Sequence, residues 1–192
     1  IGRNDHAGTT PMAIRKDALA AGSDIILGFE RICKRMDALV GTIGRVEVFP
    51  NSLNVVPGKM VLGMDVRSMS TALIDQTFSL LRKELDRIRD RRGIEIKMET
   101  EIVSKPVLFP RKMVDRIRQA CDRLQIPYLK MTSGAGHDAM HIAEISPTGM
   151  VFIPSRDGRS HSPEEWTDFE HICQGTEVLA CTIAELDREG KT

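Results

Sequence analysis

The chain has 192 residues, of which 41% are hydrophobic and 28% charged, and its 27 Lys and Arg balance its 27 Asp and Glu. These values are typical of a globular protein and exclude a disordered or collagen-like chain. The zero net charge argues against nucleic-acid binding, and no apolar run approaches the roughly 20 residues of a membrane span. We therefore expect neither nucleic acid nor membrane as a partner.

The first part of the chain predicts a helix followed by two strands. Apolar residues recur at helical spacing after Pro11, so a helix capped by Thr10 is expected to run to about Asp37. Apolar and polar residues then alternate at residues 42–49 and 59–67, which is the pattern of half-buried strands.

A second helix is expected between a cap at Ser70 and a stop at Gly93. Its polar face mixes acidic and basic residues, which is typical of a solvated surface. Alternation at residues 94–99 predicts a closing strand. The resulting order, with an antiparallel sheet and two helices on one face, is a ferredoxin-like layout.

The pattern changes near Pro106, which we take as a domain boundary. Helices and strands then alternate, as in parallel α/β units, but two strands are too few for a complete sheet. The upstream strands of this domain are therefore expected to precede Ile1. The expected elements are a helix at 114–124, a strand at 128–131, a glycine-rich turn at 133–136, a short helix at 137–142, a strand at 150–154 and a helix at 169–183.

The ends and the cysteines point to a cellular context. The chain starts without an initiator Met or a signal-peptide pattern, which we interpret as a piece cut from a longer polypeptide. Its cysteines form no C-x-x-C pair, and three of them fall on apolar stripes of predicted helices. Free thiols in a cytoplasmic protein are expected, rather than a disulfide framework or a zinc knuckle. The cysteines are Cys33, Cys121, Cys173 and Cys181.

Three of the five histidines lie where a ligand could reach them. His6 stands among small residues before a helix start, His137 follows the glycine-rich turn, and His161 lies in the loop after an apolar strand. The alternative for His6 is a surface turn residue. His141, one helical turn after His137, could join it in binding a metal, but no third ligand lies nearby; His171 is expected to be structural.

Two further polar residues are candidates for ligand binding. Arg67 lies on the polar face of a strand and offers a rigid fork that matches a carboxylate. The alternative is an ion pair with Asp65 or with a neighbouring strand. Asn54 lies among turn residues, and it either binds a ligand or only forms the turn.

Five segments, taken in order, resemble the amidase/carbamoylase branch of the M20 metallopeptidase-like family. That branch contains N-carbamoyl-L-amino-acid hydrolases, allantoate amidohydrolases and β-ureidopropionases. The segments are DHAGTTPM at residues 5–12, NSLNVVPG at 51–58, DVRS at 65–68, SGAGHD at 133–138 and SHSPEE at 160–165. The first segment is the most specific for this branch.

The resemblance implies an α/β fold with an α+β lid. Residues 1–105 would form a ferredoxin-like lid that dimerises, and residues 106–192 the C-terminal part of an α/β, zinc-peptidase-like catalytic domain. The implied activity is metal-dependent hydrolysis of a linear C–N bond in N-carbamoyl-L-amino acids or related ureido acids. The implied partners are a ureido acid substrate and a second copy of the chain, joined through the lid.

The resemblance also assigns roles to individual residues. His161 matches the last ligand of a centre with two divalent ions, which could be zinc, manganese or cobalt. His6 matches a lid histidine that contacts the scissile carbonyl in the partner subunit. Asn54 and Arg67 match residues that hold the substrate carboxylate, and Gly136 and His137 match a loop that lines the substrate pocket.

The chain departs from the family pattern in one large respect. The stretches that supply the other metal ligands and the general base lie upstream of the lid in the family, and this sequence does not contain them. We therefore expect the fragment to be inactive alone. The alternatives are another M20 branch, a dipeptidase or deacetylase, and a non-catalytic dimerisation module.

Overall fold

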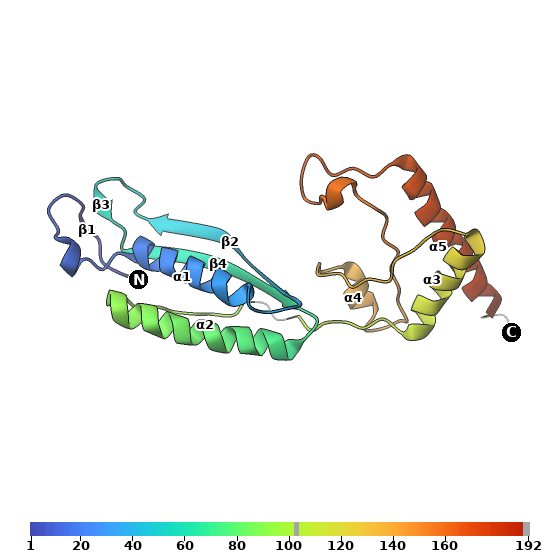
Figure 1. Cartoon of the computed structure of the whole chain (residues 1–192), viewed down its shortest axis with the longest axis horizontal. Coiled ribbons are helices and arrows are strands. Elements are labelled where there is room, and N and C mark those ends of the chain that lie inside the picture. Colours follow the sequence, from blue (N-terminus) through green and yellow to red (C-terminus); the bar gives the residue numbers. More distant parts are fainter. Residues whose placement is uncertain (102–103, 190–192) are drawn as a thin grey trace. The chain divides into compact units, whose positions relative to one another are not determined.

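The computed structural model describes residues 1–101 and 104–189. The chain divides into two compact units, Ile1–Pro106 and Val107–Thr192, called unit 1 and unit 2 below. Unit 1 combines a long antiparallel strand pair with two helices, whereas the regular structure of the described part of unit 2 is helical (Figure 1). The expected α/β class, with a small antiparallel sheet, is confirmed.

The long strand pair of unit 1 is the scaffold on which its helices pack. Strands β2 (Leu39–Phe49) and β4 (Lys59–Ser68) run antiparallel, with Leu39 opposite Ser68 and Phe49 opposite Lys59. A bulge between Ile43 and Arg45 interrupts their register. The two expected strands are thus confirmed, and each is longer than its alternation indicated. A second pair joins β1 (Asp5–His6) to β3 (Val55–Val56).

Helices α1 (Ala18–Cys33) and α2 (Thr71–Arg92) cover one face of β2 and β4 (Figure 1). The buried cluster between them consists of apolar side chains at helical spacing from both helices, together with neighbours from β2 and the segment after α2. Its members are Ala21, Ile25, Phe29, Cys33, Leu39, Leu81, Leu85, Ile88 and Ile94. This burial is the main force that holds unit 1 together.

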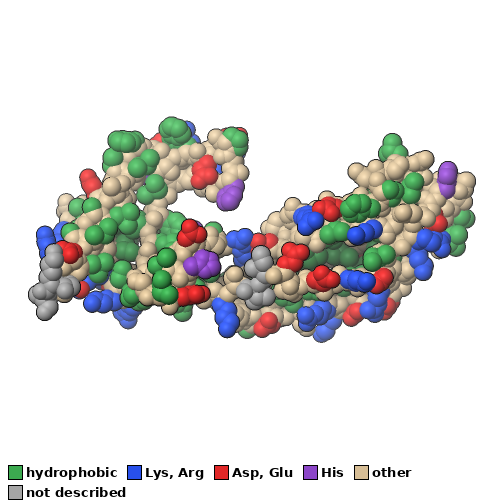
Figure 2. Space-filling view, turned by 180° about the vertical axis from the view of Figure 1, so that it is seen from behind, with side chains coloured by type: hydrophobic (Ala, Val, Ile, Leu, Met, Phe, Trp, Pro, Cys, Tyr) green, Lys and Arg blue, Asp and Glu red, His purple; other side chains and the backbone are tan. Residues whose placement is uncertain are grey.

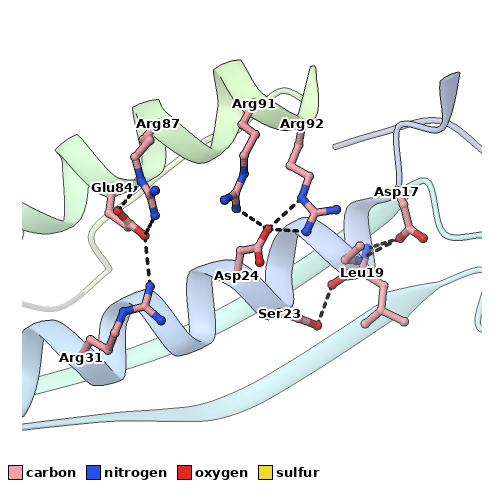
Figure 3. Close-up of polar contacts among 10 residues, drawn as sticks. Asp17, Leu19, Ser23, Asp24, Arg31, Glu84, Arg87, Arg91 and Arg92 are labelled. Carbon is pink, nitrogen blue, oxygen red and sulfur yellow. Dashed lines mark hydrogen bonds and ion pairs between the residues drawn. The ribbon is translucent and has the colours of Figure 1, made fainter. Parts of the chain in front are cut away.

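Cross-helix ion pairs border this cluster (Figure 3). Asp24 of α1 pairs with Arg91 and Arg92 of α2, and Glu84 of α2 pairs with Arg31 of α1. The mixed-sign face of the second helix is therefore a surface of paired charges, as its sequence indicates.

The start of the first helix was predicted wrongly. Residues Met12–Ile14 form a short 3₁₀ helix, Arg15 is extended, and α1 begins only at Ala18. The side chain of Asp17 caps α1 by accepting from the amides of Leu19 and Ala20. The true cap is therefore an aspartate seven residues after the threonine that the sequence favoured. Both ends of α2 are confirmed, with Ser70 as N-cap and Gly93 in the left-handed C-cap conformation.

The closing strand expected at residues 94–99 is not formed. Ile94 is buried in the cluster, and Glu95 exchanges two backbone hydrogen bonds with Ile1. One paired residue makes no ladder, so the segment buries Ile94 without becoming a strand, and Met98 at its far end is exposed.

Unit 2 is built on two helices, α3 (Arg111–Leu124) and α5 (Phe169–Glu189), which pack together. Their buried cluster comprises Ala120, Cys121 and Val178. The short helix α4 (Asp138–Ile142) and a 3₁₀ turn at Arg156–Gly158 lie between α3 and α5 in the sequence. The two strands expected at residues 128–131 and 150–154 are not formed, because no described segment of unit 2 pairs with them.

The four cysteines are free, as expected, and Cys33 and Cys121 are buried. Within residues 1–101 and 104–189, every helix is too short or too polar to cross a membrane.

Candidate functional site

His6 lies in β1 opposite Val55 of β3, with its side chain exposed. Its Nδ1 accepts a hydrogen bond from the backbone N–H of Gly8 at 3.0 Å. A neutral imidazole that accepts at one ring nitrogen carries its proton on the other, so Nε2 is the donor of His6. The imidazole can therefore donate a hydrogen bond to a carbonyl oxygen that reaches it.

Asn54 lies beside His6, in the turn that leads into β3. Its backbone oxygen accepts from the amide of Ala7 at 2.9 Å, and its side-chain Oδ1 accepts from the hydroxyl of Ser52 at 2.7 Å. The carboxamide NH₂ group remains the donor end of this side chain. The structure thus brings together two of the residues that the sequence singled out, and both offer hydrogen-bond donors.

Arg67 lies near the end of β4 and lines an open depression on the sheet with Val40, Thr42 and Arg45. Its guanidinium pairs with Asp65, at 2.7 Å between the nearest atoms. These hydrogen bonds lower the pKa of Asp65 and raise the pKa of Arg67. The alternative to a ligand-binding role, an ion pair with Asp65, is therefore what the structure contains. Both side chains are about half exposed, at 48% and 49%.

Arg67 and His6 lie at opposite ends of unit 1. The β1–β3 pair that carries His6 adjoins the Lys59 end of β4, whereas Arg67 lies eight residues further along that strand (Figure 1). At about 3.3 Å per residue, the strand between Lys59 and Arg67 is about 26 Å long. Asn54 lies at the His6 end, so the structure does not bring Asn54 and Arg67 together within one copy of the chain.

The glycine-rich turn of unit 2 holds His137 through a serine. The hydroxyl of Ser133 lies 2.7 Å from Nε2 of His137 and accepts from the amide of Ala135 at 3.1 Å. The imidazole packs against Phe152 in a T-shaped arrangement, with 5.5 Å between ring centroids. A side chain added at Gly136 would meet no atom within 4 Å, so the backbone there is open to approach. The sequence does not predict the contact between His137 and Ser133, because the side chains of turn residues can form hydrogen bonds with several different neighbours.

His161 lies in the polar loop after the 3₁₀ turn of unit 2. Its backbone is in the left-handed region, at a φ of 57°, and its amide donates to the carboxylate of Glu165 at 2.9 Å. The neighbouring Ser162 hydroxyl is buried and makes no hydrogen bond to the described residues. A non-glycine residue in this conformation is held there by its surroundings, so the loop presents His161 in a defined way.

The described residues do not complete a metal centre. Within residues 1–101 and 104–189, no group of three or more His, Cys, Asp or Glu side chains could hold a metal ion. His137 and His141 therefore have no third ligand among the described residues. A single histidine provides one of the three or four protein ligands that a zinc site needs. His171, expected to be structural, lies in α5 with its Nδ1 3.4 Å from Oε1 of Gln174.

Arg15 is a further residue near His6, and the sequence pattern does not mark it as functional. The guanidinium of Arg15 contacts the carbonyl oxygens of Ala7 and Thr10, in the loop after His6. The pattern after Pro11 predicts a helix, which would place Arg15 in that helix rather than against this loop.

Residues 6–185 match the sequence model of the Peptidase family M20/M25/M40. N-carbamoyl-L-amino-acid amidohydrolase of Paenarthrobacter aurescens is 38% identical over 97% of this chain and 46% of its own length. Allantoate amidohydrolase of Escherichia coli is 38% identical over 96% of this chain and 45% of its own length. A crystal structure of an amidase of the hydantoinase/carbamoylase family from Burkholderia multivorans superposes with a TM-score of 0.84 and 37% identity, covering 94% of this chain and 44% of that one. The chain spans about half the length of these relatives.

Proposed function

The chain belongs to the Peptidase family M20/M25/M40, and from this premise we propose that residues 1–192 form part of an amidohydrolase that cleaves linear C–N bonds. The resemblance to the amidase/carbamoylase branch is confirmed by relatives named as amidohydrolases. The proposed substrates are N-carbamoyl-L-amino acids or related ureido acids. Residues 1–105 would act as the lid, and residues 106–192 as the C-terminal portion of the catalytic domain.

The observation that carries this proposal is the placement of His6. Its Nδ1 is occupied by the amide of Gly8, so Nε2–H is available as a donor on an exposed strand beside Asn54. Hydrolysis of a ureido or amide bond develops negative charge on the carbonyl oxygen, and a fixed N–H donor stabilises that charge. We assign this contact to His6.

Arg67 would hold the carboxylate of the substrate. Its present partner, Asp65, forms a solvent-exposed ion pair, and such pairs contribute only about 0–1 kcal/mol. A substrate carboxylate that replaces water around the guanidinium can therefore displace Asp65. The bidentate fork of an arginine suits this exchange.

The distance between Arg67 and His6 supports a homodimer. Only a few bonds separate the carboxylate from the carbonyl of an N-carbamoyl amino acid, whereas β4 alone is about 26 Å long between Lys59 and Arg67. One copy cannot apply both residues to one substrate. The site would instead combine Arg67 of one copy with His6 of another, through an interface between lids.

Enzymes of the M20 family generally use divalent metals. We propose that His161 supplies one ligand to such a centre of two zinc, manganese or cobalt ions, with the remaining ligands and the general base outside residues 1–192. Because the described residues contain no group of three or more potential ligands for a metal ion, residues 1–192 alone are expected to be inactive. Gly136 and His137 would line the substrate pocket.

Ammonia release tests this function. Residues 1–192 alone, and a chimera in which they replace the matching C-terminal segment of the Paenarthrobacter aurescens relative, would be assayed with divalent metal. The panel comprises N-carbamoyl-L-amino acids, N-carbamoyl-β-alanine, allantoate and a dipeptide. Ammonia from the chimera alone is the expected result. Hydrolysis of the dipeptide alone would favour the dipeptidase alternative, and a metal-independent dimer without any hydrolysis would favour a dimerisation module.

Substitution of Arg67 tests the carboxylate clamp in the same chimera. Arg67→Ala is expected to raise KM by an amount equivalent to about 2–4 kcal/mol, because the bound substrate would exclude water from the guanidinium and its carboxylate would then lose its partner. Arg89→Ala is the matched control, because Arg89 lies in the same unit and also pairs with exposed carboxylates, those of Asp86 and Asp90, but does not line the depression beside Arg67. An unchanged KM in Arg67→Ala would remove Arg67 from the site.

A further inference from the structure

The loop between β1 and the first 3₁₀ helix is tied down by a half-buried arginine. Nε of Arg15 donates to the carbonyl oxygen of Thr10 at 3.0 Å, and one terminal nitrogen donates to that of Ala7 at 2.5 Å. We propose that Arg15 is the positioning residue for His6. Its fork holds both sides of Gly8, so that the amide of Gly8 keeps the imidazole in one orientation and one tautomer. This inference rests on the function proposed for His6.

The hydrogen bonds of the loop converge on His6. The amide of Thr10 donates to the backbone oxygen of His6 at 3.1 Å, and the amide of Gly8 donates to its Nδ1 at 3.0 Å. The amide of Ala7 is already engaged with Asn54. The loop is thus anchored to the strand pair on one side and to the guanidinium on the other, and Gly8 lies between the two carbonyl groups that Arg15 holds.

Arg15 reaches the loop because its backbone is extended. It follows the 3₁₀ helix Met12–Ile14 at a φ of −69° and a ψ of 137°, and the long helix starts only at Ala18. A guanidinium presents several N–H groups in a rigid plane, so it can bind two carbonyl oxygens at once. An ammonium group on a flexible stem lacks this fork.

Gly8 also makes room for the ring. A Cβ atom at this position would lie 3.3 Å from Cε1 and 3.5 Å from Nδ1 of His6. The first of these distances is tighter than ordinary van der Waals contact, so a side chain at position 8 would push the imidazole aside. Gly8 therefore affects the imidazole of His6 in two ways: its backbone N–H donates to Nδ1, and its lack of a side chain leaves space for the ring.

The tautomer of His6 is measurable in the full chain by ¹⁵N NMR of the imidazole nitrogens, at a pH where the ring is neutral. The wild-type chain is expected to show the Nε2–H form, with Nδ1 shifted by its hydrogen bond. In Arg15→Ala this shift is expected to be lost and the ring signals to broaden. Arg15→Lys should restore it only in part, because the ammonium lacks the fork.

Two variants complete the test. Arg3→Ala is the matched control, since its guanidinium pairs with Asp5 of the same segment; it should leave the His6 signals unchanged. Gly8→Ala keeps the N–H but displaces the ring, and should weaken the Nδ1 shift without any change at Arg15. Amide spectra of β2, β4 and α1 report whether each variant is folded.

Three results would overturn the proposal: a wild-type His6 protonated at Nδ1, an unchanged His6 signal in a folded Arg15→Ala chain, or an equal change in Arg3→Ala. If Arg15→Ala unfolds the chain, Gly8→Ala becomes the deciding variant. An unchanged His6 ring signal in Gly8→Ala would contradict the proposal that this loop orients the imidazole. These readouts do not depend on turnover. A fixed tautomer without ammonia release from the chimera would leave the positioning role intact and refute the proposed function.

Discussion

The two units differ in how much apolar surface they bury by themselves. Unit 1 encloses Phe29 and Leu81 at 1% exposure between two helices and a strand pair. The described part of unit 2 has a much smaller buried cluster, and it leaves Leu129 and Ile145 more than 80% exposed. Figure 2 shows apolar side chains on the surface of both units, and on unit 1 they lie among charged side chains of both signs.

The contrast shows what a strand needs beyond its own pattern. Residues 59–67 alternate and find a partner in β2, so they form a ladder. Residues 128–131 and 150–154 carry comparable apolar patterns without a described partner, and they remain irregular. Helices satisfy their backbone groups internally, so they form in both units. We therefore expect unit 1 to be the more stable of the two.

The largest expected effect follows from truncating matched aromatic residues, one in each unit. Phe29→Ala empties the centre of the unit 1 cluster and should lower its free energy of unfolding by about 3–5 kcal/mol. Phe152→Ala in unit 2, where the ring is 47% exposed, should cost at most about 1.5 kcal/mol. Native-state hydrogen exchange in α1 and in α3 separates the two losses. Equal losses in both helices would show that the units unfold together.

Two buried thiols measure the difference in opening directly. Cys33 and Cys121 are 9% and 6% exposed, and burial raises the pKa of both thiols. The test uses variants in which only one cysteine remains. Cys121 should react with a thiol reagent at least about tenfold faster than Cys33, because unit 2 opens more readily, and this ratio corresponds to a difference of about 1.4 kcal/mol in the free energy of opening. Cys173 alone, which is only partly buried, gives the fast reference. Equal rates at Cys33 and Cys121 would contradict the difference in stability.

The smallest effect concerns acid stability and the link between α1 and α2. The hydrogen bond from Arg87, followed by the nearby positive charges, lowers the pKa of Glu84. A carboxyl whose pKa is lower in the folded state stabilises that state above its unfolded pKa of about 4.3 and loses the effect as pH falls through the folded value. Glu84→Gln should therefore flatten the fall in unit 1 stability below about pH 4.3.

Glu30→Gln is the control for this experiment. The pKa of Glu30 is also lowered, mainly by a hydrogen bond from Lys34, but both side chains are exposed, and Lys34 is the C-cap of the same helix, α1. Urea unfolding of both variants at pH 7, 5 and 3 gives the comparison. A larger change in Glu30→Gln than in Glu84→Gln would show that the cross-helix contact with Arg31 adds nothing.

Much of unit 1 could be predicted from its sequence, because its signals are local. Ser70 and Gly93 mark the ends of α2 through hydrogen bonds and backbone conformation within a few residues. The alternation at residues 59–67 similarly needs only the two-residue period of a strand. The sequence places the start of α1 wrongly, because Thr10, Pro11 and Asp17 are all residue types that favour a helix start. Only the packed structure selects Asp17 as the cap.

The candidate site divides in the same way. The sequence by itself singled out His6, Asn54, Arg67, His137 and His161 as candidates, because each lies in a segment whose residue types carry a chemical meaning. Only the tertiary structure decided that Asn54 lies beside His6, that Arg67 lies at the opposite end of unit 1 from His6, and that Arg15 reaches the loop after His6. The physical reason is that these contacts depend on strand pairing and on the path of a long side chain, and neither is encoded in the spacing of neighbouring residues.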